Sequence, residues 1–579
     1  MLLLRVLLFC SILNAQPAKV PPKRSSQIEN GFGINSDLPR EPYLPWDRWW
    51  WTRMFDAGVS WIRIGQYENS SDYTSWDWVE QKRGVFAVKP EVDDYVDSLV
   101  ENGVKVQVQL MYGNPMYTGP GGKKPDSIEP KPGSFHNDDR SIDSVFWAPK
   151  SQEEIAAFIR YVKWTVNHFK GRIHYYALWN EQDIGYWNYA NPEEYGRLLA
   201  AFAPAVHETD PQAKVIYGGQ ADPTSDFAKR ALDECKCAAQ LDVFAYHTYP
   251  GYGQNMHPES MDSGAYGVES PAKLRALVKN YPGIRKDIEF WDDEFNSIPS
   301  WKGSDESVQA KYIPRGILYN HAAGVKTFVW LLTAGVDGNE YDDFGFIHGR
   351  RELPDDFTPR PVYYALQNTN ALFADTKLDA SIGIEPSDVP PLRRQGRAPF
   401  LHYGFRNKNG KAIVAYWVAA HSNAGGAFAP LTVNLKLKNS GIQKPVLIDV
   451  VSGEISPLTF KGEMLEGLPL RDSVMAIADA SYFDWPVLPE APSGLKVKRW
   501  VSDMSGWKLQ WESHNPASTK FVVEVRPLQF QSSWTRIDGF SSEPEFVDFT
   551  SRNAFVCYRV RAINDAGESA YSNIACVGR

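Results

Sequence analysis

The chain has 579 residues, of which 43% are apolar and 13% aromatic. At roughly 100–200 residues per domain this length predicts several domains with buried cores, and it excludes a short linker peptide or a disordered tail. Asp and Glu (70) outnumber Lys and Arg (61), so the net charge is −9. This is the wrong sign for a protein that binds by neutralising phosphates, and we expect no nucleic-acid partner.

The first residues have the order expected of a secretory signal. A positive charge at Arg5 precedes the apolar run VLLFCSIL, and small residues follow at Ala15 and Ala18. We therefore expect a signal peptide within residues 1–18, cleaved after Ala15 or Ala18, and a secreted or periplasmic protein. No later segment has the roughly 18 consecutive apolar residues of a membrane span, so none is expected.

Residues 28–375 alternate between short β-like runs and helical patterns, which is typical of βα units around a parallel sheet. The runs are apolar almost throughout, as strands covered on both faces are. Helices are expected at 151–169, where Ser151 and Glu154 form a capping box, and at 306–324. Eight strands are expected, at 31–35, 61–65, 104–110, 175–181, 214–219, 242–250, 288–295 and 326–332.

Eight strand–helix units predict an α/β fold of the (β/α)8 type, a TIM barrel. A doubly wound open sheet is the competing architecture, but no glycine-rich phosphate motif follows the first strand. The longest connection, 113–150, is rich in Gly, Pro and charge. On a barrel it would lie at the active-site rim, with Tyr117 and Trp147 bordering a cleft, unless it is a solvated flap that contacts nothing.

Residues 376–486 are expected to form a β-sandwich packed against the barrel, because the helical periodicity ends and strands with turn signals follow. The clearest signal is a hairpin with Asn409-Gly410 at its turn. A Pro-rich joint then leads into a last all-β unit, 489–579. This unit resembles a fibronectin type III domain in its Trp511, its Tyr-x-Val-x-Ala run and its Asn-x-x-Gly turn, and we assign it no chemistry.

Besides Cys10 in the signal peptide the chain has Cys235, Cys237, Cys557 and Cys576. An oxidising compartment would permit this even number to pair. Cys557 and Cys576 lie symmetrically about the turn NDAG, which favours a bridge across a hairpin. Cys235 and Cys237 have no further Cys or His nearby at zinc-ligand spacing, so structural thiols or a local bridge are expected there.

Two glutamates stand at the ends of predicted strands four and seven, Glu181 in YYALWNE and Glu294 in EFWDDEF. These strands are nearly opposite in an eight-strand ring, so both carboxylates would point into one mouth. A separation of roughly 5–5.5 Å suits glycoside hydrolysis by double displacement, which needs one protonated and one ionised carboxyl group. Taken alone, Glu181 could equally cap the next helix.

Five further side chains are expected at or near strand ends on the same rim: Arg63, Asn180, His247, Tyr249 and Trp330. Such a gathering favours a site over coincidence. No cluster has metal-ligand spacing of the H-E-x-x-H type, so we expect no metal, and this chemistry needs no cofactor.

The set resembles glycoside hydrolase clan A, retaining enzymes with an acid/base Glu after strand four and a nucleophilic Glu after strand seven. The motifs LWNEQD (178–183) and WDDEF (291–295) are most similar to family 39, the family of β-xylosidases and α-L-iduronidases. Gln182 departs from that family, whose motif reads WNEP. A barrel followed by a β-sandwich and a fibronectin-like module also resembles the α-L-iduronidase layout.

The resemblance implies a role for each residue. Glu181 would be the general acid and then the base, with a pKa raised by an apolar wall and by the charge opposite. Glu294 would be the nucleophile, kept ionised by Arg63 and Tyr249. The implied substrate contacts are Asn180 at the sugar 2-hydroxyl, His247 beside it, and Trp330 as a stacking floor unless this Trp is barrel core.

Asp292 and Asp293 precede Glu294 and could compete for its place. Because side chains alternate along a strand, an inward Glu294 predicts Asp293 towards the helix layer and Asp292 one level down in the barrel. Glu68 and Asp183, also near the rim, are expected to be hydrogen-bonding or capping residues.

These patterns predict a secreted retaining clan A glycosidase, similar to family 39, with a carbohydrate as its substrate. A second hypothesis is an endo-β-glucanase or mannanase resembling family 5, which a long groove would favour; a pocket closed by 113–150 and 335–361 would favour a terminal-sugar enzyme. A third is a non-catalytic carbohydrate-binding protein on a barrel scaffold, against which the presence of both glutamates speaks. The sugar, the linkage and the oligomeric state are left open.

Overall fold

The computed structural model divides into two compact units, Met1–Tyr482 and Phe483–Arg579. The predicted signal peptide before Ala18, Glu68, and much of the loops 113–150 and 335–361 lie outside the described residues. Described are residues 18–35, 53–65, 73–119, 123–128, 147–184, 187, 191–222, 225–250, 257–263, 270–300, 304–330, 345–347, 358–389, 399–425, 431–483, 489–500, 506–516, 519–527, 533–537, 540–551, 555–564 and 567–577.

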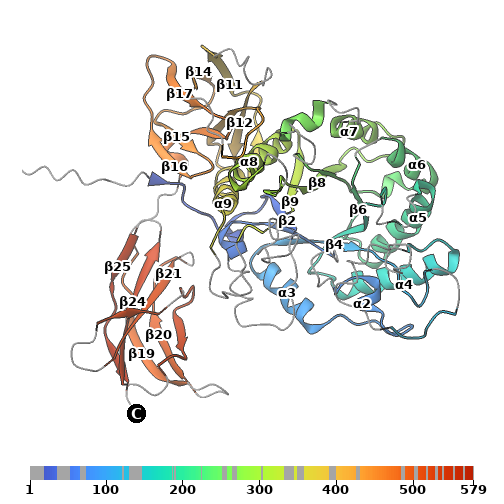
Figure 1. Ribbon diagram of the computed structural model, residues 1–579, viewed down its shortest axis with the longest axis horizontal. Coiled ribbons are helices and arrows are strands. Elements are labelled where there is room, and N and C mark those ends of the chain that lie inside the picture. The colour runs from blue at the N-terminus through green and yellow to red at the C-terminus, as the bar shows by residue number, and fades with distance from the viewer. Residues whose placement is uncertain are drawn as a thin grey trace, which may run out of the picture. The chain divides into compact units, whose positions relative to one another are not determined.

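The first unit contains a closed barrel of eight parallel strands, which confirms the predicted fold (Figure 1). The ring closes because the first strand, β2, pairs with the last, β9, as well as with β3. Every predicted strand is present, with bounds shifted by a few residues at most. The barrel strands are β2 (Gly33–Asn35), β3 (Trp61–Ile64), β4 (Lys105–Leu110), β5 (Tyr175–Asn180), β6 (Lys214–Gln220), β7 (Val243–Thr248), β8 (Glu289–Phe295) and β9 (Val325–Val329).

Helices surround these strands on the outside (Figure 1). At the start of α4 the predicted capping box is present, since Glu154 N–H donates to Ser151 Oγ at 3.2 Å and Ser151 N–H donates back to Glu154 Oε2 at 2.9 Å. The helices are α2 (Trp76–Val79), α3 (Pro90–Glu101), α4 (Gln152–His168), α5 (Pro192–Thr209), α6 (Ser225–Cys235), α7 (Pro271–Lys279), α8 (Glu306–Ala322) and α9 (Pro361–Phe373), with short 3-10 turns at η1 (Ser25–Gln27), η5 (Ala238–Gln240), η6 (Pro258–Ser263) and η9 (Ala480–Tyr482).

The interior of the barrel changes character along its axis. Near the amino ends of the strands it is filled by a buried apolar cluster that includes Trp61, Trp291 and Phe328. Two or three residues further along the same strands, buried charged side chains follow, such as Arg63 and Glu294. The apolar floor therefore supports a polar layer at the carboxyl end, where active sites of this fold are built.

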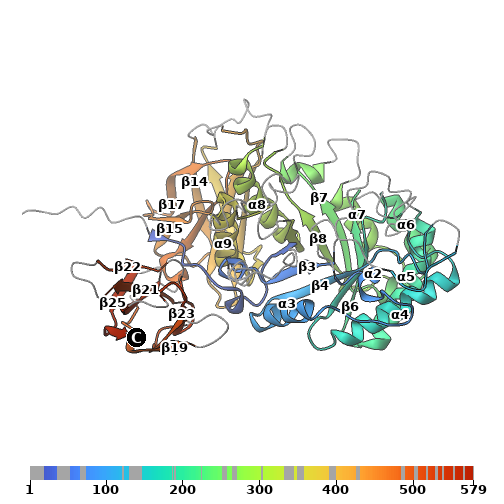
Figure 2. The same cartoon turned by 60° about the horizontal axis from the view of Figure 1, so that its bottom comes forward.

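The sandwich of the first unit has a seven-stranded and a three-stranded sheet. Its hairpin β12–β13 has the predicted turn, in which Gly410 has φ 77° and donates its N–H to Asn407 O. Figure 1 and Figure 2 both place α8 and α9 between the barrel strands and the sandwich. The strands are β1 (Ala18–Lys19), β10 (Thr376–Leu378), β11 (Gly383–Ser387), β12 (Phe400–Asn407), β13 (Ala412–Val418), β14 (Leu431–Lys438), β15 (Pro445–Asp449), β16 (Glu454–Pro457), β17 (Met464–Leu470) and β18 (Met475–Asp479).

The second unit is an all-β unit of two antiparallel sheets around a core that contains Trp507, Trp511 and Tyr558. Its likeness to a fibronectin type III domain stays a prediction. Its strands are β19 (Ser493–Trp500), β20 (Gly506–Glu512), β21 (Lys520–Pro527), β22 (Thr535–Arg536), β23 (Glu545–Asp548), β24 (Val556–Asn564), β25 (Gly567–Tyr571) and β26 (Ala575–Val577).

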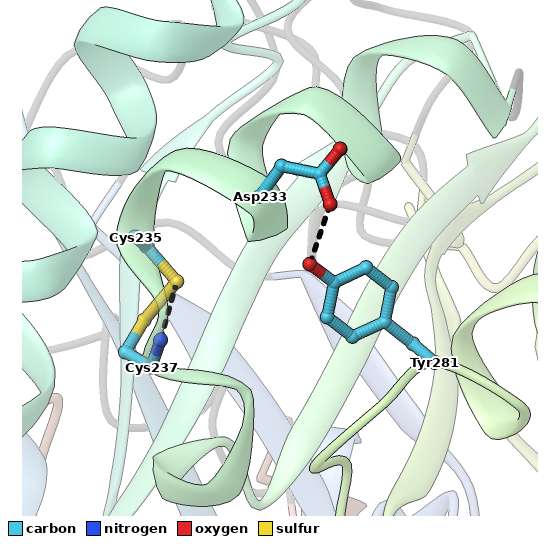
Figure 3. The surroundings of a disulfide bond; sticks show 4 residues. All are labelled: Asp233, Cys235, Cys237 and Tyr281. Carbon is cyan, nitrogen blue, oxygen red and sulfur yellow. Dashed lines mark hydrogen bonds between the residues drawn. A yellow bond between two sulfur atoms is a disulfide. The ribbon is translucent and has the colours of Figure 1, made fainter.

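Two disulfides are formed. Cys557 and Cys576 face each other across the antiparallel pair β24–β26. The predicted pairing is present, although the second cysteine lies on β26 and not on β25, which forms the hairpin with β24. The other bridge joins Cys235, the last residue of α6, to Cys237 (Figure 3). In the same view Tyr281 Oη donates to Asp233 Oδ1 of α6 at 2.7 Å. Within the described residues, no helix is both long enough and apolar enough to cross a membrane.

Candidate active site

The two predicted glutamates meet at the carboxyl end of the barrel. Glu181 directly follows β5, and Glu294 lies near the end of β8. One carboxylate oxygen of each, together with a ring nitrogen of His247 from β7, form a set whose atoms all lie within 4.8 Å of one another. Two acidic groups and one basic group are thus brought together over a distance that a single sugar ring can bridge.

Glu294 is buried, with 2% of its side chain exposed, and it is held by two donors. Arg63 of β3 forms an ion pair with Oε1, and the hydroxyl of Tyr249 donates to Oε2. Burial alone would lower the pKa of Arg63, but the charges of Glu294 and Asp293 raise it. Burial and the charge of Glu294 raise the pKa of Tyr249 well above 10. Arg63 therefore stays cationic and Tyr249 stays a donor, as a nucleophilic carboxylate requires.

Glu181 has a different environment. Its side chain is 14% exposed, and its Oε1 lies 2.9 Å from His247 Nδ1. Burial is the main cause that raises the pKa of Glu181; the hydrogen bond from His247 opposes it and the charge of Glu294 adds to it. A carboxyl group whose pKa is raised in this way is suited to hold and deliver a proton near neutral pH.

Asn180, the last residue of β5, has a side chain held in a fixed orientation. Its Oδ1 accepts from Gln109 Nε2 at 2.9 Å and from Arg63 Nη1 at 3.3 Å. Its Nδ2 is buried and has no hydrogen-bond partner among the described residues. Because the oxygen is occupied, the amide offers only its donor side to a ligand, as the predicted contact with a sugar 2-hydroxyl requires.

The backbone around this amide is strained. Trp179 and Glu181, on either side of Asn180, have φ of 67° and 48°, in the left-handed region that costs a non-glycine residue energy. The neighbouring strand β6 has glycine at two positions where a side chain would collide with neighbouring atoms. A Cβ on Gly219 would lie 2.0 Å from His247 Nε2, and one on Gly218 would lie 2.1 Å from Leu178 O.

The prediction for Asp292 and Asp293 was wrong. Asp293 points into the barrel, where its Oδ2 accepts from Gln107 Nε2 at 2.9 Å and lies 3.5 Å from Arg63 Nη1. Asp292 points to the helix layer and accepts hydrogen bonds from Thr248 and from Asn320 of α8.

The physical reason is a bulge in β8. Tyr246 pairs with Asp292 but the next residue, His247, pairs with Glu294, so Asp293 is an extra residue in the ladder. The register shifts on the β9 side as well, between Asp292 and Phe295. A bulge breaks the alternation of side chains, and two consecutive residues then face the same side.

Several residues of the site were missed. Gln107 and Gln109 of β4 hold Asp293 and Asn180, and Asn35 Nδ2 donates to the carbonyl of Asp293 at 3.2 Å. A signal existed for the glutamines, since two polar residues at spacing two in KVQVQL share one face of an otherwise apolar strand. No comparable sequence signal exists for the bulge.

The remaining predicted residues lie as follows. Trp330, just after β9, is 8% exposed and its ring meets that of Tyr249 edge-on with centroids 6.0 Å apart. Tyr117 does not stand free at the rim but stacks on Trp76 of α2. Trp147 is half-buried. Asp183 binds the end of β6, because its carboxylate accepts from the N–H groups of Ala221 and Asp222 at 2.9 and 2.7 Å.

A metal ion is a chemical alternative at this site, because the clustered atoms of Glu181, His247 and Glu294 are of ligand type. A cation bound there would face the guanidinium of Arg63, which already pairs with Glu294. We assign the cluster no metal on this electrostatic ground.

Solved structures that resemble the chain include two glycoside hydrolases. A family 39 glycoside hydrolase from the gut symbiont Bacteroides cellulosilyticus WH2 is 19% identical with a TM-score of 0.55, over 79% of this chain and 83% of the other. A bacterial orthologue of human α-L-iduronidase is 14% identical with a TM-score of 0.52, over 97% and 98%. The chain has their fold. This confirms the fold that the resemblance to family 39 implied. No protein-family model matches the sequence, and a comparison with curated proteins finds no match.

Proposed function

We propose that the chain is a retaining glycoside hydrolase that cleaves an O-glycosidic bond of a glycan by double displacement. The observation that carries the proposal is the pair Glu181 and Glu294, with oxygens within 4.8 Å of each other. In retaining enzymes the two carboxyl groups are roughly 5–5.5 Å apart, whereas inverting enzymes need roughly 6.5–9.5 Å to admit a water molecule. The short separation therefore favours retention.

In the first step Glu181 donates its proton to the leaving oxygen while an oxygen of Glu294 attacks the anomeric carbon. The glycosidic bond breaks, and the sugar becomes an ester of Glu294. Arg63 and Tyr249, which hold the carboxylate of Glu294, fix the direction of attack.

In the second step a water molecule attacks the anomeric carbon and the ester bond breaks. Glu181, now ionised, takes the proton of this water and returns to its starting state. The Nδ2 of Asn180 would donate to the sugar 2-hydroxyl in both transition states, since its Oδ1 is occupied by Gln109 and Arg63.

The test is a panel of aryl β-xylosides, β-glucosides, α-L-arabinosides and iduronides. The wild type should hydrolyse at least one, and Glu294→Gln should lose the rate by orders of magnitude. The control Glu193→Gln should keep it, because Glu193 of α5 forms an exposed ion pair with Arg230 of α6. Glu181→Gln should be slow with poor leaving groups, while its first step with dinitrophenyl glycosides should be spared because these leave without a proton.

Two outcomes would contradict the proposal. The first is a wild type that binds oligosaccharides of these sugars but releases no product, which a non-catalytic binding scaffold would do. The second is an unchanged rate in Glu294→Gln. Cleavage inside long β-glucans or mannans without release of single sugars would instead favour the family 5-like alternative.

We further propose that the chain is exported. The predicted signal peptide and two disulfides, Cys235–Cys237 and Cys557–Cys576, fit an oxidising compartment. The strand β1 begins at Ala18, so cleavage after Ala15 would leave it whole. Protein recovered from the periplasm or the medium should then begin at Gln16, and protein retained in the cytosol with residues 1–15 attached would contradict export.

A further inference from the structure

His247 has carboxylate oxygens within 3.4 Å of both of its ring nitrogens. On one side, Nδ1 lies 2.9 Å from Glu181 Oε1 and 3.4 Å from Glu294 Oε2. On the other side, Nε2 lies 3.3 Å from Asp293 Oδ1 and 3.4 Å from Arg63 Nη1. The ring is fully buried, and Gly219 of β6 leaves it the space that it occupies.

The groups that face this ring come from several strands. β6 contributes the uncharged Gly219, and Asp183 and, when ionised, Asp292 interact with the ring electrostatically. The charged or titratable neighbours are Arg63 of β3, Glu181 after β5, Tyr249 after β7, and Asp293 and Glu294 of β8. Burial alone would lower the pKa of His247, but the charge of Glu294 and the contacts with Asp293 and Glu181 raise it well above 6.5.

Asp293 is the carboxylate that takes no part in the proposed chemistry. It is fully buried, and its neighbours are donors or cations: Gln107, Arg63 and His247. Burial would raise the pKa of Asp293, but His247 and Arg63 hold it below its usual range. The residue is therefore a fixed negative charge beneath the two glutamates.

With the charge of Asp293 included, the charges around His247 balance in both steps of the proposed reaction. The proposed mechanism starts with Glu294 as the nucleophilic carboxylate and Glu181 as the acid, so the cations Arg63 and His247 face the anions Asp293 and Glu294. In the ester intermediate Glu294 has lost its charge and Glu181 has gained one, so the two cations again face two anions. The negative charge moves from Glu294 to Glu181, and both lie within 3.4 Å of His247 Nδ1.

We propose that Asp293 is a positioning residue that keeps His247 as an imidazolium, whose Nδ1–H serves Glu294 in the first step and Glu181 in the second. The inference rests on the proposed function and deepens it. Without Asp293 a neutral imidazole would be favoured, and one of the two charge states of the site would lack its counter-charge.

The first test needs no enzyme activity. Protein labelled with 15N-histidine is titrated by NMR, and His247 is assigned from its missing signal in His247→Gln. We expect both ring nitrogens of His247 to be protonated at pH 7 in the wild type, and we expect the midpoint to fall by about 1–3 pH units in Asp293→Asn. A neutral His247 in the wild type, or an unchanged midpoint in a folded Asp293→Asn, would overturn the proposal. The protonation state of His247 in the wild type tests the proposal even if Asp293→Asn does not fold.

The second test is the pH profile of kcat/KM on the best aryl glycoside. Its alkaline limb reports the proton on Glu181 together with the charge on His247, and it should move to lower pH in Asp293→Asn. The matched control is Asp292→Asn, one residue away on the helix side of β8. Burial raises the pKa of Asp292 to about 8, so most of it is protonated at pH 7 and the amide preserves its charge there; kcat/KM at pH 7 and the acid limb should not change.

The two failures are distinguishable. A wild type that hydrolyses no glycoside refutes the proposed function, and with it the role of His247 in turnover, whatever the NMR titration gives. An active enzyme whose alkaline limb in Asp293→Asn lies where it does in the wild type overturns the role of Asp293 and leaves the glycosidase intact.

Discussion

Among single residues, hydrogen bonds within the protein fix which atoms of a side chain can still bind a ligand. Asn180 illustrates this best, because Gln109 and Arg63 occupy its oxygen and leave one donor for a ligand. Left-handed φ at Trp179 and Glu181 shows that the chain tolerates strain to hold this arrangement. A donor that is already oriented stabilises the transition state without a free-energy cost of reorientation.

This arrangement predicts how Asn180→Ala behaves. Its kcat/KM should fall about 100-fold on a substrate with a 2-hydroxyl, because one preorganised donor to the reacting sugar is lost. On the matching 2-deoxy glycoside the wild type and the variant should differ little, since the contact is absent in both. Equal losses on the two substrates would show that Asn180 acts through the fold and not through the hydroxyl.

At the element scale, strand β6 contributes no side chain to the chemistry and yet decides where His247 can lie. Gly219→Ala would place a Cβ 2.0 Å from His247 Nε2. A displacement of about 1 Å can cost a catalytic group about 100-fold in rate, so we expect a loss of at least that size in kcat/KM. The control is Gly383→Ala in β11, where the nearest atom is Lys438 Cβ at 3.1 Å. Similar rates for both variants would contradict the tight fit of the imidazole.

The elements were predictable because their physical signals are local. Apolar runs covered on both faces gave the eight barrel strands, and the capping box at Ser151 gave the start of α4. The glutamates could be placed in one mouth because strand ends converge in any closed barrel. The bulge in β8 was not predictable from the sequence WDDEF, which by itself suggests only that side chains alternate between the two faces of the strand. The bulge arises from the pairing of β8 with β7 and β9.

At the scale of the first unit, a buried ion pair connects the barrel to the sandwich. Arg315 of α8 is paired bidentately with Glu259 of η6 and also donates to the carbonyls of Ala420 and Asp472. Trp417 of β13 donates to the same carboxylate at 2.5 Å. All three side chains are buried, so this contact ties the position of the helix layer to that of the sandwich.

Glu259 should make stability depend on acid pH. Burial opposes ionisation, but Arg315 and His257 lower the pKa of Glu259 from 4.5 to about 2. The stabilisation is therefore fully present above pH 4.5 and is lost as the pH falls towards 2; the shift corresponds to about 3 kcal/mol. Thermal unfolding should show Glu259→Gln far less stable than the wild type at pH 7, with a smaller gap at pH 3, where part of the stabilisation remains. The exposed control Glu463→Gln should change the stability little at either pH. If Glu259→Gln lost the same amount of stability at pH 7 and at pH 3, the assignment would be contradicted.

In the proposed mechanism Glu294 becomes covalently bonded to the sugar while Glu181 carries the proton. The most direct measurement uses the 2-deoxy-2-fluoro analogue, with an activated leaving group, of whichever glycoside the panel identifies. Such a reagent forms the ester faster than water hydrolyses that ester. Mass spectrometry of the digested protein should find one added fluorosugar on the peptide that contains Glu294, and none in Glu294→Gln. A sugar attached to another residue, or turnover of the parent glycoside with inverted product and no adduct, would contradict the account.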